Sequence, residues 1–245
     1  MAPALIWDLP TRLFHWLLAA GFAAAAFIAL VLGEHSALFP YHAILGLTLV
    51  LMVALRVVWG VVGTRYARFG SFAFGPGAVV AYAKSTMFGG GTRHVGHNPG
   101  SAWAIFAMLA LVLALGVTGV LMGMGVKGWK DAHELCAYAL VGVVVVHVLG
   151  VALHTLRHRE NITASMIHGR KNAEPASAIA SARPLAAIVF LVVTGAWVVG
   201  LLRNYDPGTQ RTTVPLWGAS LQLGEGESKE RDGVRGRDRD HDDDD

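Results

Sequence analysis

Residues 132–156 read AHELCAYALVGVVVVHVLGVALHTL, an apolar stretch that contains three histidines. A helix needs about 20 apolar residues to cross about 30 Å of hydrocarbon, so this stretch predicts a transmembrane helix. His147 follows His133 by fourteen residues, just under four helical turns, so both rings share one helix face about 21 Å apart. Because ionisable side chains inside a membrane are costly, each of these histidines is a candidate functional residue.

Four further apolar stretches have the length of a transmembrane helix, at residues 13–32, 41–62, 102–123 and 184–202. The 245-residue chain is 54% hydrophobic and only 15% charged, whereas soluble domains contain about 25% charged residues. A single cysteine, Cys136, excludes a disulfide framework and a multi-cysteine metal site. We expect an all-α integral membrane protein, with a transmembrane bundle of four helices and a fifth, C-terminal transmembrane helix.

Basic residues predict the orientation of the chain. Residues 1–202 hold thirteen Lys and Arg against six Asp and Glu, and most of these cations precede span one or lie between spans two and three and spans four and five. Cytoplasmic loops carry such an excess, so we expect a cytoplasmic N-terminus and a periplasmic C-terminus. An excess of basic residues would suggest a nucleic-acid partner in a soluble protein. Here these residues lie between apolar spans, where they reflect membrane topology, so we expect no nucleic-acid partner.

The sequence divides into residues 1–171 as the four-helix domain, 172–202 as linker and fifth span, and 203–245 as a charged tail. The tail holds seven Lys and Arg against eleven Asp and Glu and ends in four aspartates, which predicts a disordered segment. An acidic docking strip for a basic partner, such as a c-type cytochrome, is the alternative. We also expect an interfacial segment with a short helix in the glycine-rich residues 70–100.

The span directions assign a depth to each histidine. His42 and His133 both lie near the periplasmic start of their spans, whereas His15 and His147 lie toward the cytoplasm. Each layer therefore offers two imidazoles from different helices, the arrangement that holds a six-coordinate haem iron. Two imidazoles without a nearby carboxylate or thiolate cluster fit tetrahedral zinc poorly. We expect two haem b groups stacked across the membrane.

Other residues near these layers have competing interpretations. Arg56 lies fourteen residues after His42, at the depth of His147, where its guanidinium could bind a haem propionate. Alternatively, Arg56 lies near the cytoplasmic end of its span and extends its charge to the membrane surface. His154 competes with His147 for the inner iron; otherwise it would bind a propionate or line a quinone pocket. Small residues such as Gly119 make room for a cofactor or for helix packing. The remaining histidines lie in loops, where we expect them to be solvated: His35, His94, His97, His158 and His168.

The chain resembles the bacterial cytochrome b561 family, which includes the b-type cytochrome subunits of nickel–iron hydrogenases. The matching pieces are residues 7–16 (WDLPTRLFHW), His42 with Gly46 and Arg56, residues 59–63 (WGVVG), residues 96–99 (GHNP), residues 133–135 (HEL) with His147 and His154, and residues 158–161 (HREN). The resemblance covers residues 5–171. It implies a four-helix core with two b haems, ligated by His15, His42, His133 and His147.

The resemblance also implies electron exchange with the quinone pool and with a redox partner in a bacterial inner membrane. That partner would be a periplasmic c-type cytochrome or a membrane dehydrogenase or hydrogenase subunit. Candidate residues for a quinone site are Arg56, His154 and Arg157 on the inner side, or Lys127, Trp129 and Lys130 on the outer side. The alternatives are a quinone oxidoreductase that acts on a small substrate such as superoxide, and a haem-free transporter or proton conductor.

Overall fold

The computed structural model describes residues 2–88 and 94–224. Five helices are long and apolar enough to cross a membrane, as the sequence predicts. They are α1 (Leu9–Phe27, continued by a π-helix over Ile28–Leu32), α2 (Phe39–Val62), α4 (Pro99–Gly123), α5 (Lys130–His158) and α7 (Pro184–Arg203). The mostly helical chain is therefore an all-α membrane bundle, and the predicted span boundaries agree with the structure to within a few residues.

Proline and side-chain caps determine where the long helices begin. Asp8 caps α1 by accepting a hydrogen bond from the Thr11 amide, and Pro10 stands in the first turn. Asn98 caps α4 in the same way, with Pro99 as the first helical residue. Such caps satisfy amide groups that have no partner within the helix, and proline has no amide hydrogen to satisfy.

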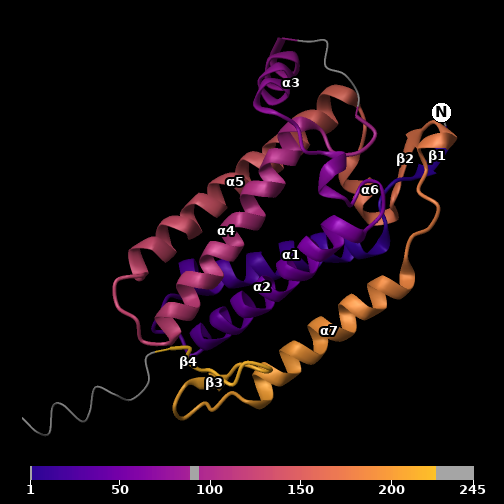
Figure 1. Cartoon of the computed structure of the whole chain (residues 1–245). Helices are drawn as coiled ribbons and strands as arrows, with labels where there is room; N and C mark the ends of the chain where they lie inside the picture. Colours follow the sequence, from indigo (N-terminus) through magenta and orange to yellow (C-terminus); the bar gives the residue numbers. More distant parts are fainter. Residues whose placement is uncertain (1, 89–93, 225–245) are drawn as a thin grey trace, which may run out of the picture.

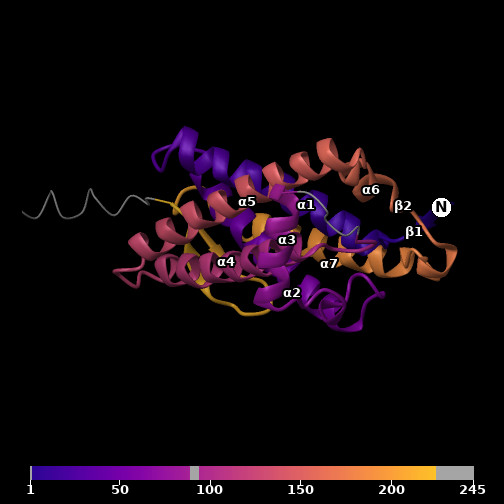
Figure 2. The same ribbon diagram turned by 90° about the horizontal axis from the view of Figure 1, so that it is seen from above.

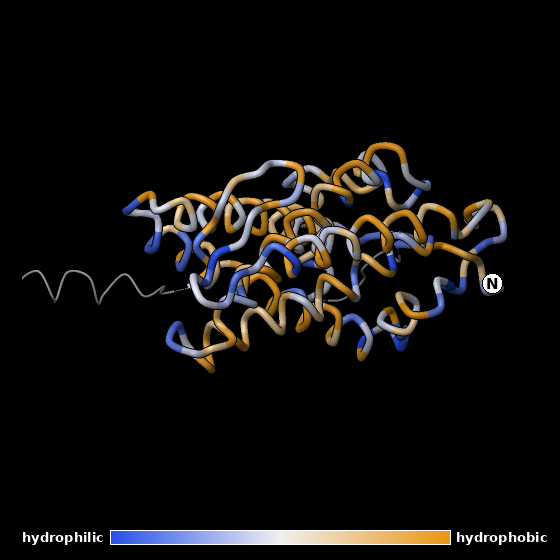
Figure 3. Tube along the Cα trace, turned by 90° about the horizontal axis from the view of Figure 1, so that it is seen from below, coloured by the Kyte–Doolittle hydropathy of each residue, from blue (hydrophilic) through white to orange (hydrophobic). Residues whose placement is uncertain are grey.

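The long helices pack as a layered bundle. Helix α1 packs on α2, α2 on α4, and α4 on α5, while α7 packs against α1 and α2 (Figures 1 and 2). The core between them is formed by apolar side chains such as Phe14, Leu49, Val53 and Leu109. The helices are mainly hydrophobic in Figure 3, where hydrophilic residues lie mostly toward the two ends of the molecule. Many large apolar side chains on the helices are exposed, as expected where lipid is the solvent.

A compact cap closes the end of the bundle that carries the N-terminus, which we call the N-terminal end (Figure 1). Strand β1 (Ala2–Leu5) pairs antiparallel with β2 (Arg170–Ala173), and the short helix α6 (Ile162–His168) connects this sheet to α5. Ile6 and Trp7 are buried beneath the sheet against Tyr66. Helix α3 (Pro76–Phe88) lies beside α4, so a short helix is present within residues 70–100 as predicted, but its apolar residues do not gather on one face as in the amphipathic helix expected there.

A β-hairpin covers the opposite end, which we call the hairpin end. Strands β3 (Arg211–Thr213) and β4 (Ser220–Gln222) pair antiparallel. Val214, Leu221 and Leu223 pack with Ile44 of α2 and Leu201 of α7. The prediction of a disordered tail is therefore wrong for residues 203–224, because alternate apolar residues of this segment are buried against the helix ends. Residues 225–245, with the acidic docking strip, lie outside the described residues.

Candidate metal-binding site

Two histidines from different helices face each other at the hairpin end of the bundle. His42 lies in the first turns of α2 and His133 in the first turn of α5, and their ring centroids are 6.3 Å apart. Two imidazoles that bind one metal ion from opposite sides, with bonds of about 2 Å each, place their centroids about 6 Å apart. His42 and His133, which the sequence predicts at one depth, thus lie next to each other with their rings edge to face.

The hydrogen bonds of these two rings determine which nitrogen remains for a metal. His42 Nδ1 lies 2.9 Å from the Ala25 carbonyl oxygen, which can only accept, so this nitrogen carries the proton. Thr118 Oγ1 donates to the Ala114 carbonyl at 2.9 Å and accepts from His133 Nδ1 at 2.8 Å. In both rings the unprotonated nitrogen is Nε2, the tautomer in which metal-binding histidines are held.

The Ala25 carbonyl lies at the point where α1 changes its repeat. The helix continues as a π-helix over Ile28–Leu32, which ends where the Gly33 amide donates to the Ile28 carbonyl. Gly33 has φ +80°, a conformation that glycine adopts without strain. A change from the α to the π repeat alters the pairing of nearby carbonyl groups, and such segments are frequent at functional sites. The carbonyl that contacts His42 thus lies three residues before the π-helix.

The helices that carry the histidines are not all packed tightly against one another. Helix α5 packs along α4, but within the described residues it forms no extensive interface with α1 or α2, which carry His15 and His42. A Cβ atom built on Gly46 or Gly142 would meet no other atom within 4 Å. Gly119 of α4 lies beside the His133 ring, whereas Gly116 allows α4 to pack closely against Val50 of α2. The space and the facing imidazoles fit a haem.

The second pair of predicted ligands lies toward the N-terminal end. His15 of α1 and His147 of α5 are close enough to interact electrostatically. His15 Nδ1 is buried and makes no hydrogen bond within the part of the chain that the structure describes. His97, which precedes α4, interacts with both of these histidines as well. His15 and His147 thus lie in one region toward the N-terminal end, together with His97.

Arg56 of α2 is buried near the second pair, with only 4% of its surface exposed. Its Nη2 donates to the Ala67 carbonyl at 3.0 Å, and its guanidinium lies 5.0 Å from the ring centroid of Phe69. The side chain is therefore packed within the protein, with its guanidinium beside the segment that follows α2. Nη1 is buried and has no hydrogen-bond partner among the described residues, so one donor remains for an anionic group.

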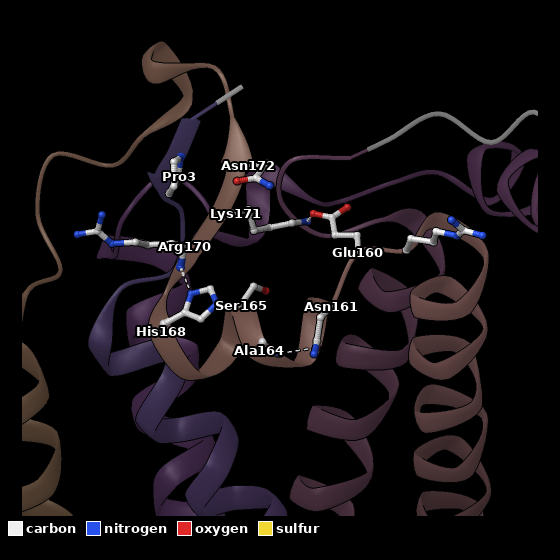
Figure 4. Close-up of a pocket in the computed structure, with 10 residues that line it drawn as sticks. Pro3, Glu160, Asn161, Ala164, Ser165, His168, Arg170, Lys171 and Asn172 are labelled. Carbon is white, nitrogen blue, oxygen red and sulfur yellow. Dashed lines mark hydrogen bonds and ion pairs between the residues drawn. The ribbon is translucent and has the colours of Figure 1, made fainter.

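His154 is placed differently from His147. Its Nε2 lies 3.8 Å from Oε2 of Glu160, and Lys171 Nζ lies 3.6 Å from the other carboxylate oxygen of Glu160. This carboxylate therefore joins the end of α5 to strand β2 at the wall of a polar pocket (Figure 4). Arg157 of the same helix end donates a hydrogen bond to the Thr86 carbonyl of α3.

On the hairpin side, Lys130 forms an ion pair with Glu34 at 2.9 Å, which lowers the pKa of that carboxylate.

Three residues have structural roles at the site that the sequence did not predict for them. Thr118 orients His133, and its only sequence signal is its position between the small residues of span three. Asp8 is 1% exposed and accepts hydrogen bonds from Trp59 Nε1 at 3.1 Å and Thr64 Oγ1 at 2.5 Å, which connects α1 to the end of α2. His97 is the third.

The prediction that the loop histidines are solvated is wrong for His97 and His94. The His97 ring packs between Trp7 and Phe72, at centroid distances of 4.7 and 4.3 Å. Burial lowers the pKa of His97 to about 3, with further contributions from Arg56 and Lys171. His94 lies edge-on to Phe74 and Tyr82, and Nδ1 of both histidines is buried. The side chain of His158 lies outside the described residues.

The candidate metal ligands occur as pairs of histidines, and the described residues contain no larger cluster of metal-binding side chains. In residues 2–88 and 94–224, no group of three or more histidine, cysteine, aspartate or glutamate side chains is close enough to hold one metal ion. Structural zinc sites need four such ligands, whereas a haem iron needs only two axial ligands from the protein. Paired imidazoles in an apolar bundle are therefore suited to haem.

Comparison with known proteins agrees with this geometry. The sequence profile of the prokaryotic cytochrome b561 family matches residues 6–169. Two similar proteins are described as probable Ni/Fe-hydrogenase B-type cytochrome subunits, from Rhizobium leguminosarum bv. viciae and Bradyrhizobium diazoefficiens. Each is 24% identical over 211 residues, and the match covers 68% of this chain and 87% or 85% of the relative. No solved structure matches the chain.

The family match spans α1 to α6, including all four paired histidines, and ends before α7. Five apolar helices make the chain a multi-pass membrane protein, and the family implies haem b as its cofactor. The chain belongs to the prokaryotic cytochrome b561 family and is a membrane-bound b-type cytochrome of electron transfer.

Proposed function

We propose that the chain holds two haem b groups, one at each depth, and carries electrons across the membrane between the quinone pool and a redox partner. The observation that supports this most directly is the facing pair His42 and His133, with centroids 6.3 Å apart and both Nδ1 atoms occupied by hydrogen bonds. His15 and His147 supply the corresponding pair toward the N-terminal end.

The residues of the chain hold and tune these groups. A bound haem supplies the one-electron chemistry, and the axial ligands, their hydrogen bonds and the apolar surroundings set its potential. The Ala25 carbonyl and the Thr118 hydroxyl fix the outer imidazoles in the ligating tautomer. Arg56 Nη1 would bind a propionate at the inner group, because it is a buried donor without a hydrogen-bond partner among the described residues.

We assign His147 as the inner ligand in preference to His154. His147 interacts with His15, whereas His154 lies 3.8 Å from the Glu160 carboxylate beyond the membrane-spanning part of α5. His154, with Arg56 and Arg157, would then line a quinone pocket at the N-terminal end. The ion pair of Lys130 with Glu34 weakens the case for the outer alternative, because it neutralises one of the two cations there.

The hydrogenase subunits among the relatives support a hydrogenase as the redox partner. The distribution of basic residues supports a bacterial inner membrane location with the N-terminal end in the cytoplasm and the hairpin end in the periplasm. A periplasmic hydrogenase subunit would then meet the hairpin end, close to His42 and His133.

Electron transfer across vesicles that contain the purified chain tests this function. Ferricyanide is enclosed in the vesicles and menadiol, a reduced quinone, is added outside. The wild-type chain should accelerate ferricyanide reduction, and the variants His133→Ala and His147→Ala should each abolish the acceleration, because each removes one of the two proposed haems. The variant His168→Ala, at an exposed histidine of α6, serves as the matched control. Equal rates in wild-type and both ligand variants would contradict the proposal.

A further inference from the structure

The β-hairpin carries two large apolar side chains at its turn. Residues 214–219 (VPLWGA) connect β3 to β4, and the Trp217 and Gly218 amides both donate to the Val214 carbonyl, which closes the turn. Leu216 is fully exposed and Trp217 is 70% exposed. The turn therefore presents an apolar surface that the described part of the chain does not cover.

The hairpin is attached to the last turn of α7 (Figure 1). The buried hydroxyl of Thr212 in β3 donates to the Leu201 carbonyl at 2.9 Å. Pro215 lies against Gly200, since a Cβ atom built on that glycine would lie 2.8 Å from the proline ring. Contacts of β3 and of the turn itself therefore fix the position of the hairpin relative to α7.

The contact with Gly200 gives the depth of the turn in the membrane. Helix α7 is a membrane span over Pro184–Arg203, and Gly200 stands three residues before its end. At about 1.5 Å per residue, Gly200 lies about 4.5 Å inside the end of that span. Leu216 and Trp217 directly follow Pro215, so their side chains lie at the level of the membrane–water interface.

Other aromatic side chains of the hairpin end lie at the ends of their spans. Tyr41 stands in the first turn of α2 and Trp129 immediately precedes α5, and both are exposed. Tyrosine and tryptophan are enriched at membrane–water interfaces, where the ring contacts apolar groups and the polar atom meets water or headgroups. Trp217 is a third exposed aromatic residue at this end of the bundle.

The composition of the hairpin favours lipid over a charged partner. Residues 212–224 contain no Asp, Glu, Lys or Arg, whereas complementary charges commonly direct one soluble protein to another. The last turns of α7 expose apolar side chains such as Val199 and Leu202. Because the turn lies against the same part of α7, at Gly200, its exposed side chains continue the lipid-facing surface of that helix.

We propose that the turn of the hairpin inserts into the membrane leaflet at the hairpin end, with Leu216 and Trp217 between the headgroups and the acyl chains. Apolar side chains buried at this boundary hold interfacial elements in the membrane, and an indole N–H can still meet the headgroups. The hairpin is then an interfacial anchor fixed to α7, and its turn is not available to a soluble protein. This role is independent of the haem groups and of the electron-transfer partner.

Spin labels on the full chain in phosphatidylcholine nanodiscs, in which both membrane faces are accessible, test the proposal. In a Cys136→Ser background, which removes the single native cysteine, one label is attached at Trp217→Cys and another at Pro207→Cys, in the exposed turn before β3. The label at position 217 should collide more often with oxygen, which partitions into lipid, than with a water-soluble nickel complex. The label at position 207 should show the opposite preference.

Two further labels complete the experiment. Val192→Cys, at an exposed position in the middle of α7, gives the collision ratio of a residue in hydrocarbon. Leu216→Cys leaves Trp217 in place and should show the same preference for oxygen as the label at position 217. If the labels at positions 216 and 217 are as accessible to the nickel complex as the label at position 207, the turn lies in water and the proposal is wrong. Protection of both labels from oxygen and from nickel would also overturn it, because the turn would then be covered by protein.

Discussion

At the scale of single residues, the hydroxyl of Thr118 is expected to control how firmly His133 holds its metal. Thr118→Val keeps the shape of the side chain but removes the acceptor for His133 Nδ1. Loss of such a partner typically weakens metal binding 10–100-fold. We predict that the variant loses part of its outer haem during purification, and that the haem that remains bound there has an altered midpoint potential, as measured by redox titration.

The matched control is Thr194→Val on α7, which changes a buried threonine whose hydroxyl makes no hydrogen bond to any residue that the structure describes. It should retain wild-type haem content and both potentials. Equal haem content and unchanged potentials in Thr118→Val would show that the hydroxyl does not orient the ligand.

His97 provides a pH-dependent contribution to stability. Burial lowers its pKa to about 3 in the folded chain, from an ordinary value of 6.5. The unfolded chain therefore takes up a proton below about pH 6.5 that the folded chain excludes, and stability falls as the pH is lowered. We predict that the melting temperature falls between pH 7 and pH 5, and that His97→Gln reduces this fall. The charged groups nearest to His97 are Arg56 and Lys171, with His15 and His147.

The experiment compares wild-type and His97→Gln in the same detergent, with equal haem content verified by absorbance. His168→Gln, at an exposed histidine, should reproduce the wild-type dependence. If His97→Gln and wild-type lose the same stability between pH 7 and pH 5, the ring is not protected from protonation.

The sequence could predict the paired histidines but not their hydrogen-bond partners. Fourteen-residue spacing and the direction of each span assign a depth to His133 and His147, because helical geometry is regular. The contact of His42 with the Ala25 carbonyl depends on how α1 and α2 pack together, and no periodicity in the alanine-rich segment around Ala25 indicates it. Loops are usually exposed, so the sequence predicts a solvated His97. In the structure, tertiary packing encloses the His97 ring between two aromatic rings.

At the scale of elements, Asp8 joins the start of α1 to the end of α2. Its carboxylate caps α1 and accepts hydrogen bonds from Trp59 and Thr64. Asp8→Ala removes a helix cap worth about 1 kcal/mol and leaves buried donors without an acceptor, at about 1–3 kcal/mol. We predict a loss of about 2–4 kcal/mol in the free energy of unfolding, measured by denaturant titration in detergent.

Asp8→Asn should lose less stability, since an amide oxygen can still cap the helix and accept one hydrogen bond. Asp131→Ala provides the control, because this aspartate stands exposed in the first turn of α5 and contributes only through the helix dipole. A stability loss in Asp8→Ala no larger than that in Asp131→Ala would contradict the proposed role.

The spans were predictable and the hairpin was not, for a physical reason. Twenty apolar residues in a row have few alternatives to a membrane helix. Residues 204–224 mix turn-forming and polar residues, which resembles a disordered tail in composition. Their two buried leucines, Leu221 and Leu223, alternate with Ser220 and Gln222, the pattern of a half-buried strand. The pattern is too short to identify a strand without the helix ends against which it packs.

At the scale of the whole molecule, the histidines explain why α5 stands apart from α1 and α2. Within the described chain α5 packs extensively only on α4, yet it carries one residue of each histidine pair. Histidines on helices that are not packed tightly against each other suit a bundle that binds cofactors between its helices.

The haem content of the purified chain and its histidine variants, measured as the pyridine haemochrome, tests this account most directly. The account predicts two haem b per wild-type chain. One haem should remain in His42→Ala, His133→Ala, His15→Ala and His147→Ala, and two should remain in His154→Ala. A wild-type chain with one haem or none would contradict it, and so would a His147→Ala variant that keeps both haems while His154→Ala loses one.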